Sequence, residues 1–180
     1  CPLNVYSETK LQAENEVLSV MPEALVVRTN FFGWGTSKRT SFSDWIIKSL
    51  EQQLPLTMFT DVWFTPILVN HLAESILDLV SLRASGVLHI GGASRLTKYD
   101  FALRLASRFG YSNEIISAIR LIDLKLDAPR PLDMSISCAH AEKILGRPMP
   151  SVEQGLTYLR NLKEAGWPAM MEAAITTSPG

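Results

Sequence analysis

Residues 5–27 read VYSETKLQAENEVLSVMPEALVV, and this stretch decides the fold class. As far as Val20 its residues are mostly helix formers without Pro or Gly, and Pro22 ends the run, which predicts a helix of about four turns. Residues 24–27 then form a short, continuous apolar run, the pattern of a strand buried on both faces of a parallel sheet. A helix followed by a buried strand predicts an α/β fold.

The alternation of helix and strand continues along the chain. Apolar residues spaced i, i+3, i+4 and i+7 predict a helix over residues 69–80, and residues 86–90 form another buried strand. Thr97 then caps a helix that Gly110 ends. Further predicted elements are helices at residues 42–53, 137–145 and 151–162, a short strand at 62–65, a loop at 31–40, and a strand with a loop at 115–126.

Composition excludes several classes of partner and site. The chain has 180 residues, of which 47% are hydrophobic and 19% charged, as is typical of one soluble globular domain. Its net charge is −1 and its basic residues are scattered, so neither nucleic acid nor a membrane surface is an expected partner. Cys1, Cys138 and the three histidines lack the spacing of a disulfide framework or a metal site. No apolar run approaches the roughly 20 residues of a membrane span, and no signal-peptide pattern is present, so we expect a cytoplasmic protein.

Tyr6 and Lys10 are the residues that most strongly suggest catalysis. Four positions apart on a helix, they lie on the same face, so the ammonium can sit near the phenol. A free tyrosine has a pKa of about 10. A nearby positive charge favours the phenolate, which would let Tyr6 transfer a proton near neutral pH. Lys10 can also donate hydrogen bonds to the ribose hydroxyls of a nicotinamide cofactor. The alternative is a packed ring beside a solvated lysine, because this spacing is common on helices.

The residues around this pair resemble a known family. Residues 2–14, PLNVYSETKLQAE, are similar to the Tyr-x-x-x-Lys segment of extended short-chain dehydrogenase/reductases, especially the dTDP-4-dehydrorhamnose reductase branch. Three later segments resemble that family in the same order: 26–33 (VVRTNFFG), 64–73 (FTPILVNHLA) and 86–92 (GVLHIGG). Arg130 and Pro131, with Ser135, resemble a substrate-side motif. The matches cover most of residues 1–162, and their shared order is more specific than any single motif.

The resemblance implies both a fold and an activity. The expected fold is the second half of a Rossmann-like parallel sheet with helices plus a small C-terminal substrate-binding subdomain, over residues 1–168, followed by a flexible tail at 169–180. The implied activity is NAD(P)H-dependent reduction of a nucleotide-linked 4-keto-6-deoxy sugar, with NADP or NAD as cofactor. Tyr6 and Lys10 would be the catalytic residues and would also contact the cofactor.

The resemblance also assigns binding residues. It places Thr29 and Asn30 at the cofactor, and it places the nucleotide sugar against Asn30, Phe31, Phe64 and Arg130. Aromatic residues at strand ends can equally be ordinary core, so Phe31 and Phe64 have two interpretations. Arg130, which lies between two prolines, can clamp a diphosphate with two hydrogen bonds or form a structural salt bridge.

The sequence departs from the family pattern at several positions. Ser7 stands where many relatives carry glycine, and Asn30-Phe31 replaces a Ser-Trp pair that is frequent in rhamnose-forming reductases. Asn70-His71 replaces a usual acidic pair. These departures leave the sugar substrate open. Two alternatives stay open as well: an epimerase or dehydratase of the same superfamily, and a non-catalytic regulatory or binding relative.

The Gly-rich pyrophosphate loop of the family does not precede the predicted catalytic helix in this sequence. Gly33-Trp34-Gly35 is no substitute, because Lys38 occupies the third glycine position. We therefore expect a C-terminal portion of a longer enzyme, with activity in the full-length parent and weak NAD(P) binding by this chain alone. The strand at residues 24–28 would then have an unpaired edge, which predicts a homodimer or poor solubility unless another chain covers it.

Overall fold

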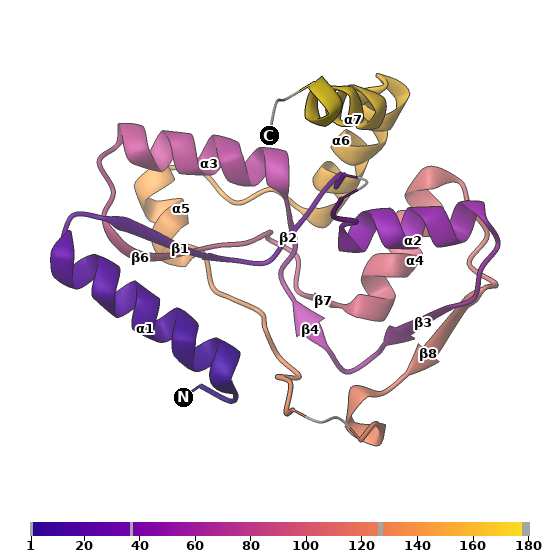
Figure 1. The fold of residues 1–180 in the computed structure, drawn as a ribbon, viewed down its shortest axis with the longest axis horizontal. Helices are drawn as coiled ribbons and strands as arrows, with labels where there is room; N and C mark the ends of the chain where they lie inside the picture. Colours follow the sequence, from indigo (N-terminus) through magenta and orange to yellow (C-terminus); the bar gives the residue numbers. More distant parts are fainter. Residues whose placement is uncertain (1, 37, 126–127, 178–180) are drawn as a thin grey trace.

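The computed structural model describes residues 2–36, 38–125 and 128–177, which form an α/β fold (Figure 1). The helices are α1 (Val5–Val20), α2 (Phe42–Glu51), α3 (Val69–Ser81), α4 (Lys98–Phe109), a short 3-10 helix (Leu121–Asp123), α5 (Ala139–Leu145), α6 (Val152–Glu164) and α7 (Trp167–Thr177). The strands are β1 (Leu25–Thr29), β2 (Phe31–Phe32), β3 (Leu56–Phe59), β4 (Trp63–Phe64), β5 (Ile67–Leu68), β6 (Gly86–Ile90), β7 (Leu96–Thr97) and β8 (Ile116–Ile119). Helices and strands alternate along most of the chain, as the sequence predicts.

The parallel pair of β1 and β6 organises one half of the molecule. Its register joins Val27 to Leu88 and Thr29 to Ile90. Leu88 and Ile90 belong to a buried cluster that side chains of α3 and α5 complete. In Figure 1, α3 and α1 lie on opposite sides of this strand pair. The pairing confirms the predicted α/β fold and the positions of both strands. The predicted burial on both faces is wrong for β1, none of whose residues is fully buried, and holds in β6 only for Leu88 and Ile90.

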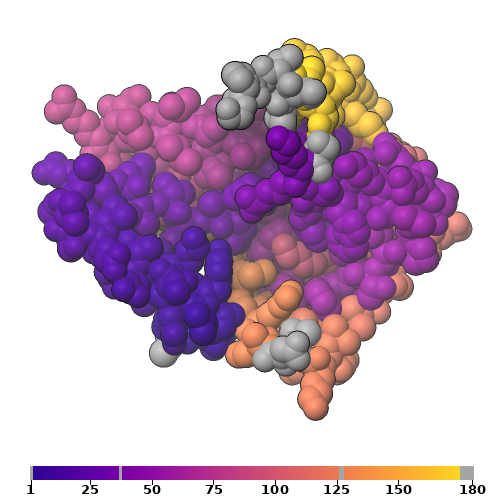
Figure 2. All heavy atoms as spheres, in the orientation of Figure 1, coloured from indigo at the N-terminus to yellow at the C-terminus, as the bar shows by residue number. Residues whose placement is uncertain are grey.

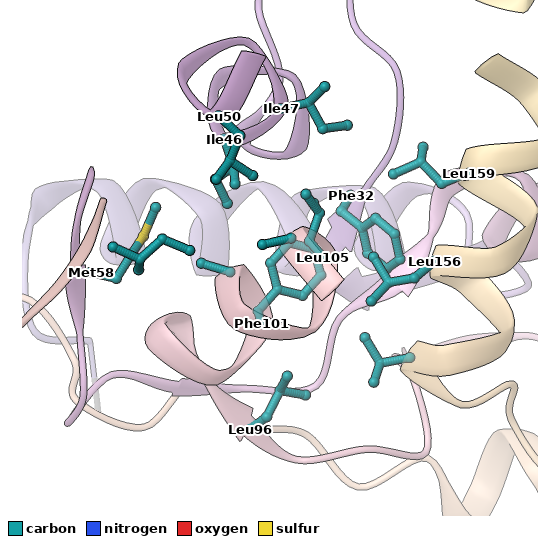
Figure 3. Close-up of a cluster of buried hydrophobic side chains, with 14 of the residues drawn as sticks. Phe32, Ile46, Ile47, Leu50, Met58, Leu96, Phe101, Leu105, Leu156 and Leu159 are labelled. Carbon is teal, nitrogen blue, oxygen red and sulfur yellow. The ribbon is translucent and has the colours of Figure 1, made fainter. Parts of the chain in front are cut away.

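The other half is built around the rings of Phe32 and Phe101 (Figure 3). Their centroids are 5.0 Å apart in an edge-to-face arrangement. Helices α2, α4 and α6 supply most of the remaining buried side chains, and Met58 and Leu96 extend the cluster into β3 and β7. Gly155 brings α6 close to this core, because a Cβ at that position would lie 2.9 Å from Cζ of Phe32.

Capping boxes fix where α2 and α4 begin. The Ser41 hydroxyl accepts a hydrogen bond from the Asp44 N–H, and the Asp44 carboxylate accepts one from the Ser41 N–H. Thr97 and Asp100 form the same reciprocal pair at the start of α4. Lys98 is the first residue of α4, so the same capping box fixes the backbone position of that lysine.

Several segments differ from the sequence prediction, and β5 and β7 are among the strands that it did not include. β2 lies within the stretch predicted as a loop and pairs in parallel with β5, because a two-residue strand has no periodicity to recognise. β3 was not predicted, although it pairs in parallel with β8. No helix was predicted after residue 162 beyond the end of α6, yet Ala, Met and Glu residues favour helix α7 up to residue 177; the flexibility of the tail at 169–180 stays a prediction. Residues 178–180 lie outside the described part of the chain, and the domain boundary at 168 stays a prediction.

Helix α1 is the most exposed of the longer helices. None of its side chains is buried, and Val5 and Val20 are 73% and 87% exposed. A bidentate ion pair between Arg28 and Glu14 joins it to β1, and the Arg28 hydrogen bonds lower the pKa of Glu14. Among the described residues β1 pairs with β6 alone, so its other edge is open there. A homodimer that covers this edge stays a prediction.

Hydropathy along the described helices gives no membrane-spanning candidate.

Candidate functional site

The start of α1 is fixed to the segment that carries Arg130. Oδ1 of Asn4 caps the helix by accepting hydrogen bonds from the Ser7 N–H at 3.0 Å and the Ser7 hydroxyl at 2.9 Å. Nδ2 of Asn4 donates to the Pro129 carbonyl at 3.1 Å. One asparagine therefore holds together the helix of Tyr6 and the residue next to Arg130.

Tyr6 and Lys10 lie on one face of α1, as predicted. Nζ of Lys10 is 5.6 Å from the centroid of the Tyr6 ring, and Tyr6 is 70% exposed. No carboxylate in the described ranges forms an ion pair with Lys10. The ammonium is therefore available to the phenol and to a ligand at the same time. This geometry fits an acid–base pair, and the catalytic roles stay predictions.

An open hollow of about 600 Å³ lies beside Tyr6. The first residues of α1 form one side of it, and Pro129 and Arg130 form the other. In Figure 2 the orange part of the chain lies beside the indigo N-terminal part on this face of the molecule. The predicted proton donor and the predicted phosphate-binding residue thus share one hollow.

Thr29 and Asn30 lie at the C-terminal end of β1. The buried Thr29 hydroxyl has no hydrogen-bond partner in the described part of the chain. Oδ1 of Asn30 accepts hydrogen bonds from the N–H and hydroxyl of Thr65, at 3.2 and 3.4 Å. The Asn30 carbonyl accepts another from the Ile67 N–H at 2.9 Å. Asn30 therefore fixes the connection between β4 and β5, and its ligand-binding role, like that of Thr29, stays a prediction.

The two predicted aromatic wall residues have different surroundings. Phe31 is 60% exposed and lines a hollow of about 440 Å³ together with Trp34 and Phe42. Phe64 is 3% exposed and belongs to the core, where its ring meets that of Phe42 edge-to-face at 6.5 Å. Phe31 is thus accessible to a ligand, whereas Phe64 supports the site from beneath.

A third cavity, the Lys98 pocket, has a volume of about 250 Å³. Its lining combines apolar side chains with two cationic ones: Phe42, Trp45, Thr57, Met58, Phe59, Val62, Lys98, Leu121, Arg130, Pro131 and Met134. Nζ of Lys98 lies 3.4 Å from the centroid of the Phe64 ring and 4.5 Å from that of Phe42. Burial lowers the pKa of Lys98 to about 8. Because Arg130 lines this pocket and the Tyr6 hollow, the two cavities are neighbours.

A polar cluster holds the segment after Arg130 against β4. Arg95 forms an ion pair with Asp133 at 2.8 Å, and the guanidinium carbon lies 4.1 Å from the centroid of a Trp63 ring. The Ser135 hydroxyl and the Arg95 guanidinium hold the pKa of Asp133 at about 2. Trp63 also exchanges backbone hydrogen bonds with both neighbours of Asp133. This cluster positions the wall of the Lys98 pocket.

Sequence reasoning identified Arg130 and Phe64 but not Lys98. The pocket draws on residues that are widely separated along the chain, and a lysine after a helix cap is ordinarily a solvated charge. The one available signal was weak: a basic residue in the first turn of a helix is disfavoured by the helix dipole. In the described residues no cluster of three or more His, Cys, Asp or Glu side chains could hold a metal ion.

The comparison with known families matches residues 1–163 to the RmlD substrate binding domain. The chain belongs to the RmlD substrate-binding-domain family. This membership confirms the resemblance to dTDP-4-dehydrorhamnose reductases that the sequence motifs indicated.

Curated relatives of this RmlD-family chain have different functions. A probable low-salt glycan biosynthesis reductase of Haloferax volcanii is 29% identical over 161 residues, which cover 88% of this chain and 54% of that protein. A dTDP-4-dehydrorhamnose reductase of Mycolicibacterium smegmatis is 26% identical, with coverages of 99% and 52%. Methionine adenosyltransferase 2 subunit beta of Xenopus tropicalis is also 26% identical, with coverages of 95% and 51%. The chain spans about half the length of the curated relatives it matches.

Solved structures share the fold. A dTDP-4-dehydrorhamnose reductase of Bacillus anthracis in complex with NADP has a TM-score of 0.80 at 20% identity, covering 89% of this chain and 56% of that one. The corresponding enzyme of Clostridium acetobutylicum has a TM-score of 0.81 at 21% identity, with coverages of 91% and 57%. The RmlD-family chain therefore has the fold of one part of these Rossmann-like reductases, as predicted.

Proposed function

We propose that the chain is the part of an NAD(P)H-dependent reductase that carries the catalytic pair and binds a nucleotide-linked 4-keto-6-deoxy sugar. The activity belongs to the full-length parent. One observation carries the proposal: Tyr6, next to Lys10, shares an open hollow with Arg130. In this proposal Tyr6 is the proton donor and Arg130 the phosphate-binding residue, and both line a space that can admit a sugar. The reductases among the relatives support the same reaction class.

Tyr6 would donate its phenolic proton to the carbonyl oxygen of the sugar as that oxygen becomes an alkoxide. Lys10, 5.6 Å from the ring, would stabilise the phenolate that remains. The nicotinamide cofactor, when bound, supplies the hydride. The residues of this chain would therefore hold the carbonyl oxygen at the phenol of Tyr6 and stabilise its phenolate until it is protonated again.

The residues at the end of β1 fit a cofactor contact. Thr29 has a buried hydroxyl without a partner in the described ranges, and a polar ligand group would satisfy it. Lys10 has three donors for ribose hydroxyls. Tyr6, Lys10, Thr29 and Asn30 would hold the nicotinamide and its ribose, and the proposal covers NADP and NAD alike.

The substrate contacts follow from exposure and charge. Arg130 is exposed, and no carboxylate of the described chain pairs with it, which favours a phosphate clamp over a structural salt bridge. Phe31 offers an exposed ring to the sugar, Asn30 offers its amide, and Phe64 supports the wall.

Turnover by the full-length parent tests the proposal. Incubation with a dTDP-linked 4-keto-6-deoxy sugar should oxidise NADPH or NADH in equal amount to the product. Conversion of the nucleotide sugar without net loss of reduced cofactor would instead assign an epimerase or dehydratase of the same superfamily.

A non-catalytic role is the second candidate, because relatives of similar identity are beta subunits of methionine adenosyltransferase 2. In that case the RmlD-type fold would serve as a partner surface. A parent that binds nucleotide sugar but turns over none of the tested substrates would favour this role.

We also infer a cytoplasmic protein of carbohydrate biosynthesis that forms a homodimer. The balanced charge and the open edge of β1 support these inferences. Light scattering on the chain of residues 1–180 tests the dimer, because this chain is the one whose β1 edge is open, and a monomer at all concentrations would contradict it.

A further inference from the structure

Lys98 carries a partly buried cation that has no anionic partner among the described residues. Its ammonium lies over the rings of Phe64 and Phe42, at 3.4 and 4.5 Å from their centroids. No side chain in the described ranges forms an ion pair or hydrogen bond with it. Cation–π contacts compensate part of the lost hydration, but buried charges are ordinarily paired. Within residues 2–36, 38–125 and 128–177, therefore, no group neutralises this positive charge.

The cavity beside this cation suits an anion joined to a flat apolar group. Trp45, Phe59 and Leu121 supply apolar walls, and Arg130 adds a second cation for which the described residues provide no ion-pair partner. The volume of about 250 Å³ is slightly below the roughly 300–1,000 Å³ of pockets that enclose a drug-sized ligand. It therefore holds one ring and not a whole nucleotide sugar.

Arg130 connects this cavity to the catalytic hollow. Its side chain lines the Lys98 pocket and also the hollow beside Tyr6. A ligand with a ring at one end and a sugar at the other would place its central phosphates at Arg130. The ring and the phosphate nearest to it would then occupy the Lys98 pocket.

We propose that Lys98 is a ligand-binding residue that selects a nucleoside diphosphate: its ammonium binds phosphate together with Arg130, and the base enters the Lys98 pocket. The ring contacts with Phe42 and Phe64 hold the ammonium in place for this contact. This inference rests on the proposed function for the identity of the ligand and adds a binding residue to it. The competing structural interpretation is that the lysine stem merely covers the core.

Isothermal titration calorimetry on the full-length parent separates these interpretations. The probes are dTDP, thymidine and inorganic pyrophosphate, and the variants are Lys98→Met and the matched control Lys143→Met, which removes an exposed lysine on α5. Methionine keeps the unbranched stem of lysine but removes its charge. We expect Lys98→Met to weaken dTDP and pyrophosphate binding by about tenfold or more. Thymidine binding should change little, and Lys143→Met should bind like the wild type.

Wild-type affinity for dTDP in a folded Lys98→Met protein would overturn the inference, and so would an equal loss in Lys143→Met. Circular dichroism and thermal unfolding establish that the variant is folded. Lys98→Arg provides the conservative test: it keeps a cation between the rings and should recover part of the dTDP affinity.

The outcomes for this inference and for the proposed function are distinguishable. A parent that oxidises no NADPH but loses dTDP affinity in Lys98→Met refutes the reductase and supports the binding residue. A parent that turns over its sugar nucleotide with an unchanged KM in Lys98→Met supports the reductase and refutes the binding residue.

Discussion

Replacing Lys98 with methionine removes a buried ammonium and keeps an unbranched side chain of similar length. Burial penalises the charged form of Lys98 and lowers its pKa from 10.5 to about 8. At 1.36 kcal/mol per pKa unit, this lowering corresponds to roughly 3 kcal/mol of lost stability at neutral pH. The contacts with Phe42 and Phe64 favour the ammonium by roughly 0.5–2 kcal/mol and reduce that cost. We therefore expect Lys98→Met to raise the free energy of unfolding by about 1–3 kcal/mol at pH 7.

The gain in stability that we expect from Lys98→Met should depend on pH. Since the pKa is lower in the folded than in the unfolded chain, the unfolded chain binds more protons between about pH 8 and 10.5, and the wild type becomes more stable as pH rises through that range. Lys98→Met lacks this contribution. The advantage of the variant should therefore be largest below pH 8 and should fall by about half at pH 9.5.

Urea unfolding followed by circular dichroism at pH 7 and pH 9.5 measures this difference, with Lys143→Met as the surface control. A Lys98→Met chain that is less stable than the wild type at pH 7 would refute the reasoning. It would mean that the ammonium makes net stabilising contacts, and that it is not held ready for a ligand.

Two further perturbations test the packing and the pocket wall. Gly155→Ala should destabilise the chain by about 1–3 kcal/mol, because the added Cβ would lie 2.9 Å from Cζ of Phe32. Urea unfolding measures this loss, and unchanged stability would mean that α6 can shift freely. Arg95→Met should raise the pKa of Asp133 from about 2 toward its ordinary value of 3.8 without restoring it fully, because the Ser135 hydrogen bonds remain; an NMR titration that finds no change would contradict the assigned cluster. The stability that Asp133 contributes should be present above pH 4 and lost as pH falls toward 2, and it should stay below about 1 kcal/mol because the pair is half exposed.

The sequence predicted the parts of the fold that local chemistry determines. α4 was recognisable because Thr97 and Gly110 mark its ends and its apolar face has helical spacing. β1 and β6 were recognisable as continuous apolar runs. β2 could not be found in this way, because Phe31 and Phe32 pair with residues more than thirty positions away and carry no periodicity of their own.

The candidate site also contains residues that local sequence reveals and residues that only tertiary packing brings together. Tyr6 and Lys10 were found because both lie on one helix at a fixed spacing. The Lys98 pocket was not found, because its cation depends on Phe42, Phe64 and Arg130, which come together only through tertiary packing. The partial burial of Lys98, away from any carboxylate of the described residues, is a property of the packed chain and has no local signature in the sequence.

The proton-donor role of Tyr6 is the central claim, and one comparison tests it most directly. Steady-state oxidation of NADPH by the full-length parent, with a dTDP-linked 4-keto-6-deoxy sugar, should be measured for the wild type and for Tyr6→Phe. Loss of a positioned acid–base group lowers the rate by about 10²–10⁴-fold, and we expect a fall in kcat of this size with dTDP binding unchanged. A Tyr6→Phe parent that keeps the wild-type kcat would contradict the account.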